Sequence, residues 1–162
     1  MTTPHDGRCT CGHVRFRLHV DPMFVHACHC TWCQRETGAA FAWNAMVEAD
    51  QVELLGGEVE RVDTPSASGR GQVVARCPQC RIAVWSNYGG RGDIVRFVRV
   101  GALEDPSRCP PDAHIFVSTK ARWLALPEGA RAFDEFYDRA AVWPEVSQQR
   151  LRDVMARHAP RK

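Results

Sequence analysis

The stretch Cys28-His29-Cys30-Thr31-Trp32-Cys33 places three thiols within a single short run of the chain. A cysteine every two or three residues lets one tight loop present several sulfurs to one metal ion, and soft thiolates favour zinc. A structural zinc takes four protein ligands, whereas a reactive zinc keeps one position open for water or substrate. This run alone fits an open, reactive site, or a structural site whose fourth ligand is His26, His29 or Cys109.

Two further cysteine pairs lie on either side of this run. Cys9 and Cys11 are one residue apart between glycines, and Cys77 and Cys80 have the C-x-x-C spacing of a zinc knuckle. The simplest use of the two pairs is one closed, four-thiolate structural zinc, which would contribute on the order of 10 kcal/mol or more to folding. The Cys28 run is then left with three sulfurs, which favours the open site.

The sequence gives less support to other roles for these cysteines. A redox dithiol at Cys77 and Cys80 is disfavoured because no thioredoxin-like alternation of strands and helices surrounds the pair. Cys109 is left over, either as a partly buried thiol in a loop or as a fourth ligand.

The composition is that of an ordinary globular domain. The 162 residues are 44% hydrophobic and 25% charged, with a formal net charge of +2. Seven thiolates on two zinc ions would lower this charge to about −1, and neither value indicates a nucleic-acid partner. There is no apolar run of the roughly 20 residues that a membrane span needs, and residues 1–8 are too polar for a signal peptide. We therefore expect a cytoplasmic protein with no membrane partner, whose cysteines bind metal rather than form disulfides.

The hydrophobic pattern predicts eight to ten short strands. Residues 14–20 alternate apolar and polar side chains, which puts His13 and His19 on the solvent face. Residues 31–36 read as one helical turn closed by Gly38. Residues 51–55 and 58–62 read as a hairpin around Gly56-Gly57. Further strands are expected at 24–27, 41–47, 72–76, 82–86, 93–100 and 114–118.

The pattern changes after Leu126. Ala130, Phe133, Tyr137 and Ala140 recur at helical spacing. A second helix after Pro144 would line one face with Val146, Leu151, Val154 and Met155. We therefore divide the chain into a zinc domain at 1–126 and a C-terminal helical extension at 127–162, packed on the same domain.

Four quoted segments together resemble a known family. They are G-R-C-T-C-G-H-V-R-F from Gly7, C-H-C-T-W-C-Q-R-E-T-G from Cys28, R-C-P-Q-C from Arg76 and H-I-F-V-S-T-K-A-R-W from His114. This set resembles the glutathione-dependent formaldehyde-activating enzyme family, which also contains centromere protein V-like domains. The resemblance covers roughly residues 7–126. Arg81-Ile82 after the second C-x-x-C, and the segment after Leu126, depart from the family pattern.

The resemblance implies an all-β fold of the β-tent kind, with short antiparallel strands around a structural zinc. By position, Cys9, Cys11, Cys77 and Cys80 match the family's structural zinc ligands, and Cys28, Cys30 and Cys33 match its catalytic zinc ligands. It also implies a carbon–sulfur lyase that joins glutathione and formaldehyde into S-hydroxymethylglutathione. The expected partners are thus a small thiol and an aldehyde, and a homodimer is allowed for.

Residues near the motifs are candidates for holding the substrate. A zinc with three thiolates carries a formal charge of about −1, so it is a weak Lewis acid but keeps a bound thiolate reactive. Guanidinium and ammonium groups would hold the carboxylates of glutathione. The candidates are Arg35, Arg91, Lys120 and Arg122. Trp32 and Trp43 either wall the pocket or are core or rim aromatics without a function, and we favour the second interpretation.

Two other functions compete with the lyase. One is a non-catalytic, zinc-stabilised binding module that holds a protein or nucleic acid at an exposed strand edge or on a face formed by Arg96 and Arg99. The other treats both metals as structural. Only the lyase requires an open coordination position and thiol-dependent turnover.

Overall fold

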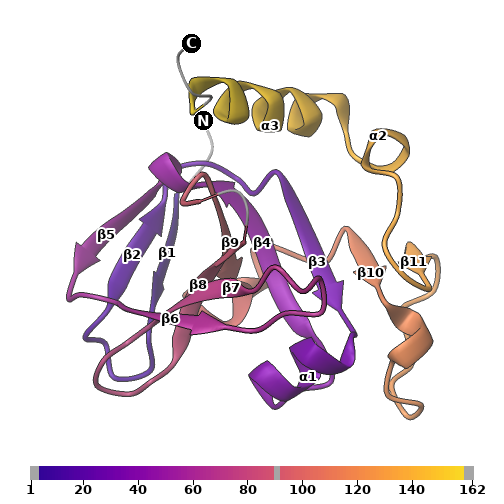
Figure 1. Cartoon of the computed structure of the whole chain (residues 1–162), viewed down its shortest axis with the longest axis horizontal. Helices are drawn as coiled ribbons and strands as arrows, with labels where there is room; N and C mark the ends of the chain where they lie inside the picture. Colours follow the sequence, from indigo (N-terminus) through magenta and orange to yellow (C-terminus); the bar gives the residue numbers. More distant parts are fainter. Residues whose placement is uncertain (1–3, 90–91, 159–162) are drawn as a thin grey trace.

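The computed structural model describes residues 4–89 and 92–158, and this part of the chain is mostly β, with eleven strands in two sheets. The small sheet has the order β1-β2-β5, with bounds His5–Arg8, Arg15–Leu18 and Val52–Gly56. The large sheet has the order β11-β10-β3-β4-β9-β8-β7-β6 (Figure 1). Its strands in chain order are β3 (Phe24–Cys28), β4 (Ala42–Glu48), β6 (Glu60–Thr64), β7 (Gln72–Arg76), β8 (Ala83–Tyr88), β9 (Val95–Arg99), β10 (Ala113–Ile115) and β11 (Ala132–Phe133).

The helices are few and mostly short. The α-helices are α1 (Thr31–Thr37), α2 (Arg139–Val142) and α3 (Glu145–Arg157). Single 3-10 turns lie at η1 (Ala49–Gln51), η2 (Val100–Ala102), η3 (Pro106–Arg108) and η4 (Val117–Thr119). The expected all-β fold with a C-terminal helix is confirmed. Within the described residues, no helix is both long and apolar enough to cross a membrane.

One face of the large sheet packs against the small sheet. Trp85 on β8 lies opposite Val98 on β9, and Val98 lies opposite Ala45 on β4, so all three point to this side. Phe16 of β2 meets Trp85 edge to face, with ring centroids 5.8 Å apart. These residues belong to the largest core cluster, which also contains Cys9 and Cys77.

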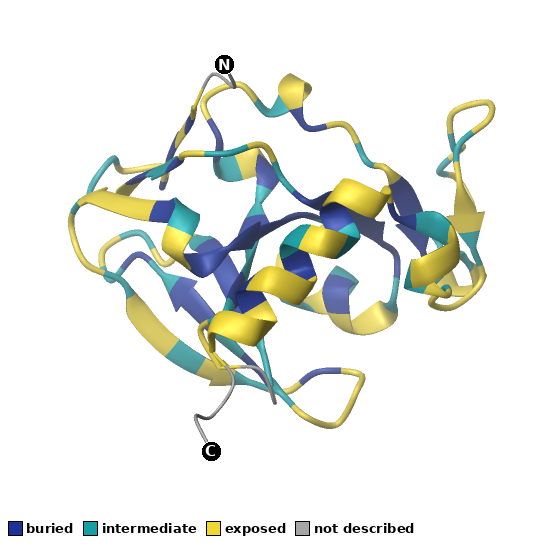
Figure 2. Cartoon of the chain, turned by 90° about the horizontal axis from the view of Figure 1, so that it is seen from above, coloured by how far each residue is buried: buried dark blue, intermediate teal, exposed yellow. Residues whose placement is uncertain are grey.

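The other face of the large sheet is the helix-covered face. It carries Phe24 and Met46, which lie opposite one another on β3 and β4. Trp143, Leu151 and Val154, from the segment around α3, pack on them. In Figure 2, seen from above, α3 lies over strands that are largely buried. At the other end of this face, α1 lies beside the ends of β3 and β4 (Figure 1).

Three expectations about pairing and helices were wrong. The hairpin of residues 51–62 does not form, because β5 pairs with β2 in the small sheet and β6 pairs with β7 in the large sheet. The chain crosses between the sheets at Gly57, whose φ is +72°. Pairing with β2, whose apolar side chains are buried, outweighs the local turn signal.

The strands are also not all antiparallel. β10 runs parallel to both β3 and β11. The segment from Ala130 to Ala140 is not one helix, since it contains β11 and only the first residues of the four-residue α2. Phe133 and Tyr137 instead pack against side chains of β3, and this tertiary packing overrides the helical spacing.

The helix after Pro144 is confirmed as α3. Leu151 and Val154 are buried, as predicted, whereas Val146 is 68% exposed and Met155 is 36% exposed. The helical turn after Thr31 is confirmed as α1. It ends at Gly38, which has a left-handed φ of 66° and donates its N–H to the Gln34 carbonyl.

Candidate metal centres

The four cysteines of the two flanking pairs lie together. Cys9 and Cys11 come from the loop between β1 and β2, and Cys77 and Cys80 come from the loop between β7 and β8. Their sulfurs all lie within 4.8 Å of one another, with Cys9 to Cys11 at 3.5 Å and Cys11 to Cys77 at 3.7 Å. Sulfurs bound to a tetrahedral zinc at about 2.3 Å would be about 3.8 Å apart. The four thiols therefore fit such an ion.

Backbone hydrogen bonds shape both loops around the sulfurs. The Val14 N–H donates to Cys9 Sγ at 3.3 Å, and the Arg81 N–H donates to the Cys77 carbonyl at 2.9 Å. Backbone donors at Cys11 and Ile82 lower the pKa of Cys80 to about 6, which favours the thiolate that a metal needs. Because Cys9 and Cys77 are fully buried, this cluster ties the small sheet to the large one.

The three cysteines of the central run form a second cluster. Cys28 ends β3, Cys30 is the N-cap of α1, and Cys33 lies in the first turn of α1. Their sulfurs also lie within 4.8 Å of one another. The Cys33 N–H donates to Cys30 Sγ at 3.3 Å. Hydrogen bonds from the thiols of Cys28 and Cys33 lower the pKa of Cys30 to about 2, which favours its thiolate. Hydrogen bonds with Cys30 and Cys33 raise the pKa of Cys28.

None of the three candidates for a fourth ligand joins this cluster. His29 is buried with its Nε2 at 3.0 Å from Nδ1 of His114, and the His26 Nε2 lies 2.5 Å from the Tyr137 hydroxyl. Cys109 is a buried thiol whose Sγ lies 3.9 Å from Nδ1 of His5. No other His, Cys, Asp or Glu atom of residues 4–89 and 92–158 completes the group of three sulfurs. The second centre therefore offers a metal three protein ligands.

A buried carboxylate fastens α1 to the large sheet. Glu36 accepts hydrogen bonds from Arg99 at 2.8 Å and from Arg76 at 2.5 Å. Arg99 also donates to the side chain of Asn44 on β4. Cys33 and Glu36 are one helical turn apart on the same side of α1, so these contacts also set the position of Cys33.

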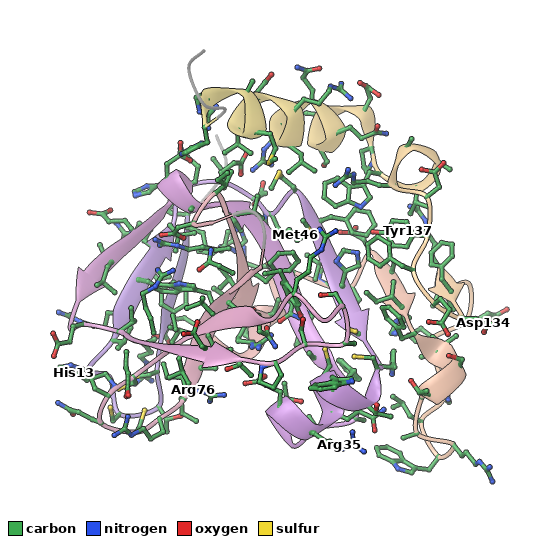
Figure 3. All side chains as sticks on the ribbon, in the orientation of Figure 1. His13, Arg35, Met46, Arg76, Asp134 and Tyr137 are labelled. Atoms are coloured by element: carbon green, nitrogen blue, oxygen red, sulfur yellow. The ribbon has the colours of Figure 1, made fainter. Side chains whose placement is uncertain are left out.

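The predicted substrate residues are scattered. Trp32 is 44% exposed on α1, and Arg35 lies on the outer side of the same helix (Figure 3). The Lys120 Nζ donates to the carbonyls of Ala121 at 3.2 Å and Leu124 at 2.5 Å. Arg122 is exposed, and Arg91 lies outside the described residues.

Strand geometry decides two further points: Trp43 is a core aromatic, as favoured above, and the expected face of Arg96 and Arg99 does not form. Trp43 points to the face of the large sheet that packs on the small sheet, so it does not wall the three-cysteine cluster. Arg96 and Arg99 lie on opposite faces of β9, because they are three residues apart in a strand. Arg96 stacks on Trp85 and pairs with Asp93, so the two arginines form no common binding face.

Three residues near the cluster were not predicted to belong to it. Tyr88 is one of them: burial raises the pKa of its phenol, and the negative charge of Cys33 raises it further. Glu36 is the second, and Arg99, which was predicted only on a binding face with Arg96, is the third. Glu36 follows Cys33 by three residues on a predicted helix, and this spacing was the one available signal for it.

Comparisons with known proteins identify the family of the chain. Residues 4–119 match the family model described as "Glutathione-dependent formaldehyde-activating enzyme". A protein of Halomonas elongata named "Putative glutathione-dependent formaldehyde-activating enzyme" is 26% identical over 145 residues, which cover 85% of this chain and 92% of that protein.

A crystal structure of a Rhodobacter sphaeroides protein superposes with a TM-score of 0.46 at 15% identity, covering 79% of this chain and 98% of that one. That likeness is too loose to support an argument. The family match spans more than half of the chain and includes all seven clustered cysteines. The chain therefore belongs to the glutathione-dependent formaldehyde-activating enzyme family.

Proposed function

We propose that this protein is a zinc-dependent carbon–sulfur lyase that joins a glutathione-like thiol and a small, formaldehyde-like aldehyde. Cys9, Cys11, Cys77 and Cys80 would hold the structural zinc, and Cys28, Cys30 and Cys33 the catalytic zinc. The observation that carries the proposal is the second cluster, where three sulfurs converge and no fourth protein donor of the described residues joins them. Family membership supports the choice of thiol and aldehyde.

The reaction is an addition without a redox change. A carbon–sulfur bond forms between the thiol sulfur and the aldehyde carbon, the thiol loses its proton, and the aldehyde oxygen gains one. A zinc bound by three thiolates would supply an open position that stabilises a further thiolate or polarises the aldehyde oxygen. The chain itself positions the three sulfurs through the N-cap of α1 and through the contacts of Glu36 with Arg76 and Arg99.

We further propose that the protein works in the cytoplasm on small molecules. Its small net charge of +2 does not support a nucleic-acid partner. Residues 127–162 form an extension packed on the domain of residues 1–126, and contacts such as Phe24 with Trp143, whose rings stack at 5.0 Å, support that arrangement.

The test measures adduct formation directly. Glutathione and formaldehyde also combine without a catalyst, so magnetisation exchange between free and adduct ¹³C-formaldehyde is recorded by NMR with and without zinc-loaded protein. We expect the protein to accelerate exchange and Cys33→Ser to reduce it to the uncatalysed rate. Cys109→Ala is the matched control, because Cys109 lies outside both clusters, and it should keep the acceleration. Full acceleration by folded Cys33→Ser would contradict the proposal.

A further inference from the structure

Five buried polar atoms on β7, β8 and β9 have no hydrogen-bond partner within the described residues, and three of them lie on one face of the sheet. These three are Oε1 of Gln72 on β7, Oγ of Ser86 on β8 and Nε of Arg99 on β9. Ser86 is fully buried, Gln72 is 8% exposed and the Arg99 side chain is 11% exposed. Buried polar groups in folded proteins almost always find a partner, so unpaired atoms of this kind indicate a ligand or ordered water.

Strand register places these atoms on the helix-covered face. Gln72 lies opposite Tyr88, Ser86 lies opposite Phe97, and Arg99 follows Phe97 by two residues. Directly paired residues, and residues two apart in one strand, point to the same side of a sheet. Arg99 in turn lies opposite Asn44.

The same face carries the three-cysteine cluster. Asn44 lies two residues from Ala42 on β4, and Ala42 lies opposite Cys28. Arg99 contacts Glu36, one helical turn from Cys33, and its positive charge acts on the Cys33 thiol. Arg99 therefore lies beside the cluster, Ser86 follows in the next row of this face, and Gln72 lies further along it, in the row of Tyr88.

The free groups are mainly donors. Both terminal nitrogens of Arg99 are engaged, by Asn44 and Glu36, which leaves its Nε–H. The Tyr88 hydroxyl has no hydrogen bond to any described residue, and Tyr88 lies two residues from Ser86 on the same face of β8. Ser86 adds another hydroxyl. A guanidinium N–H with two hydroxyls matches the two oxygens of a carboxylate, and such charge-assisted bonds are the strong ones.

Arginine side chains supply positive charge beside the cluster. The guanidinium groups of Arg76 and Arg99 share the single carboxylate of Glu36, and the Arg99 charge also acts on the Cys33 thiol. The Arg99 Nε–H is therefore a charged donor for an anionic ligand.

We propose that Arg99, Ser86 and Tyr88 form a carboxylate-binding subsite beside Cys33 that receives a carboxylate of the substrate. This inference rests on the proposed function, because it names what the thiol–aldehyde site recognises. The carboxylate belongs to the thiol, as in glutathione, or to the aldehyde, as in glyoxylate. The subsite replaces the exposed Arg35 as the main anchor for the substrate's negative charge.

The test measures binding rather than turnover. S-methylglutathione cannot react at sulfur, so its affinity for the zinc-loaded protein reports recognition alone when measured by titration calorimetry. Ser86→Ala and Tyr88→Phe each remove one donor and leave the contacts of Arg99 with Glu36 intact. We expect each to weaken binding about ten- to a hundredfold, as for a lost hydrogen bond to a charged group. The matched control, Ser107→Ala on η3, should bind as the unaltered protein does.

Two further ligands show whether the carboxylate belongs to the thiol or to the aldehyde. If the thiol supplies it, S-methylglutathione diethyl ester binds the unaltered protein weakly, and the two variants do not change its affinity further. If the aldehyde supplies the carboxylate, the variants weaken the binding of glyoxylate and leave the affinity for S-methylglutathione unchanged. Either result supports the subsite. If the protein also fails to catalyse adduct formation, only the proposed function is contradicted. Unchanged affinity for both carboxylates in folded variants, or no binding of either to the unaltered protein, would overturn the subsite.

Discussion

Glu36 on α1 accepts a hydrogen bond from Arg99 on β9 at 2.8 Å, across 63 positions of the chain. Glu36 is 10% exposed and Arg99 is 11% exposed, so the pair is largely withdrawn from water. Arg76 on β7 donates to the other oxygen of the same carboxylate. The helix that carries Cys33 is thus held to two strands by one side chain.

Replacing this carboxylate should therefore be costly. Glu36→Gln keeps the shape of the side chain but leaves two guanidinium groups without a counter-charge, and we expect a loss of about 2–4 kcal/mol in the free energy of unfolding. Glu60→Gln is the matched control. Its partner Arg81 is 66% exposed, and exposed pairs contribute less than about 1 kcal/mol. Equal losses in urea unfolding would contradict the role of Glu36.

The four-cysteine cluster should be required for folding. Cys80→Ser removes one ligand of a centre that joins the two sheets, and a structural zinc contributes on the order of 10 kcal/mol, which is comparable to the whole stability of a domain. We expect the variant, and the unaltered protein treated with a strong chelator, to lose near-ultraviolet circular dichroism and cooperative unfolding. A metal-free protein with an unchanged melting temperature would show that the cluster has no structural role.

A second ion pair fixes α3. Arg150 donates two hydrogen bonds to Glu48 of β4, at 2.8 Å and 2.6 Å, and a third to the Asp21 carbonyl at 3.0 Å. Because Glu48 is only 6% exposed, Arg150→Ala should cost about 2–4 kcal/mol. Arg152→Ala, whose side chain is 52% exposed, should cost less than about 1 kcal/mol.

The same unfolding curves test the C-terminal extension. If residues 127–162 pack on the domain as proposed, circular dichroism and tryptophan fluorescence should report one shared transition. A separate, earlier transition of the helical signal that Arg150→Ala does not move would contradict that packing.

The two tyrosines should make stability fall at alkaline pH. Burial raises the pKa of Tyr137 to about 12, and the pKa of Tyr88 is raised as well, first by burial. Above pH 10 an unfolded tyrosine releases its proton whereas the folded one keeps it, so rising pH favours unfolding. At pH 10.5 the folded protein should show little tyrosinate absorbance at 295 nm. Half-ionised tyrosine at that pH, with native circular dichroism, would contradict these environments.

Much of the metal chemistry could be predicted from the sequence because each motif is local. The spacing of Cys28, Cys30 and Cys33 predicts their convergence, and the short helix ending at Gly38 follows from cap preferences. The pairing of β5 with β2 could not be predicted in this way. Glycine spacing is a local signal, whereas the choice of partner strand depends on which face becomes buried.

The surroundings of the three-cysteine cluster depend on longer-range geometry. Glu36, Tyr88 and Arg99 meet only once the register of four strands is fixed, and a shift of one residue would turn Arg99 to the other face. Arg35 is a candidate only because it adjoins a motif in the sequence. Adjacency in sequence does not indicate where a strand far along the chain will lie. The aromatic residues of the C-terminal segment were misread for the same reason.

The most direct test of the account is the zinc content per chain, measured by elemental analysis on the unaltered protein and on Cys30→Ala. We predict two zinc ions in the unaltered protein and one in the folded variant. X-ray absorption should show that added glutathione changes the coordination of one ion in the unaltered protein and of none in the variant. A single zinc ion that neither the substitution nor glutathione affects would contradict an open catalytic centre at Cys28, Cys30 and Cys33.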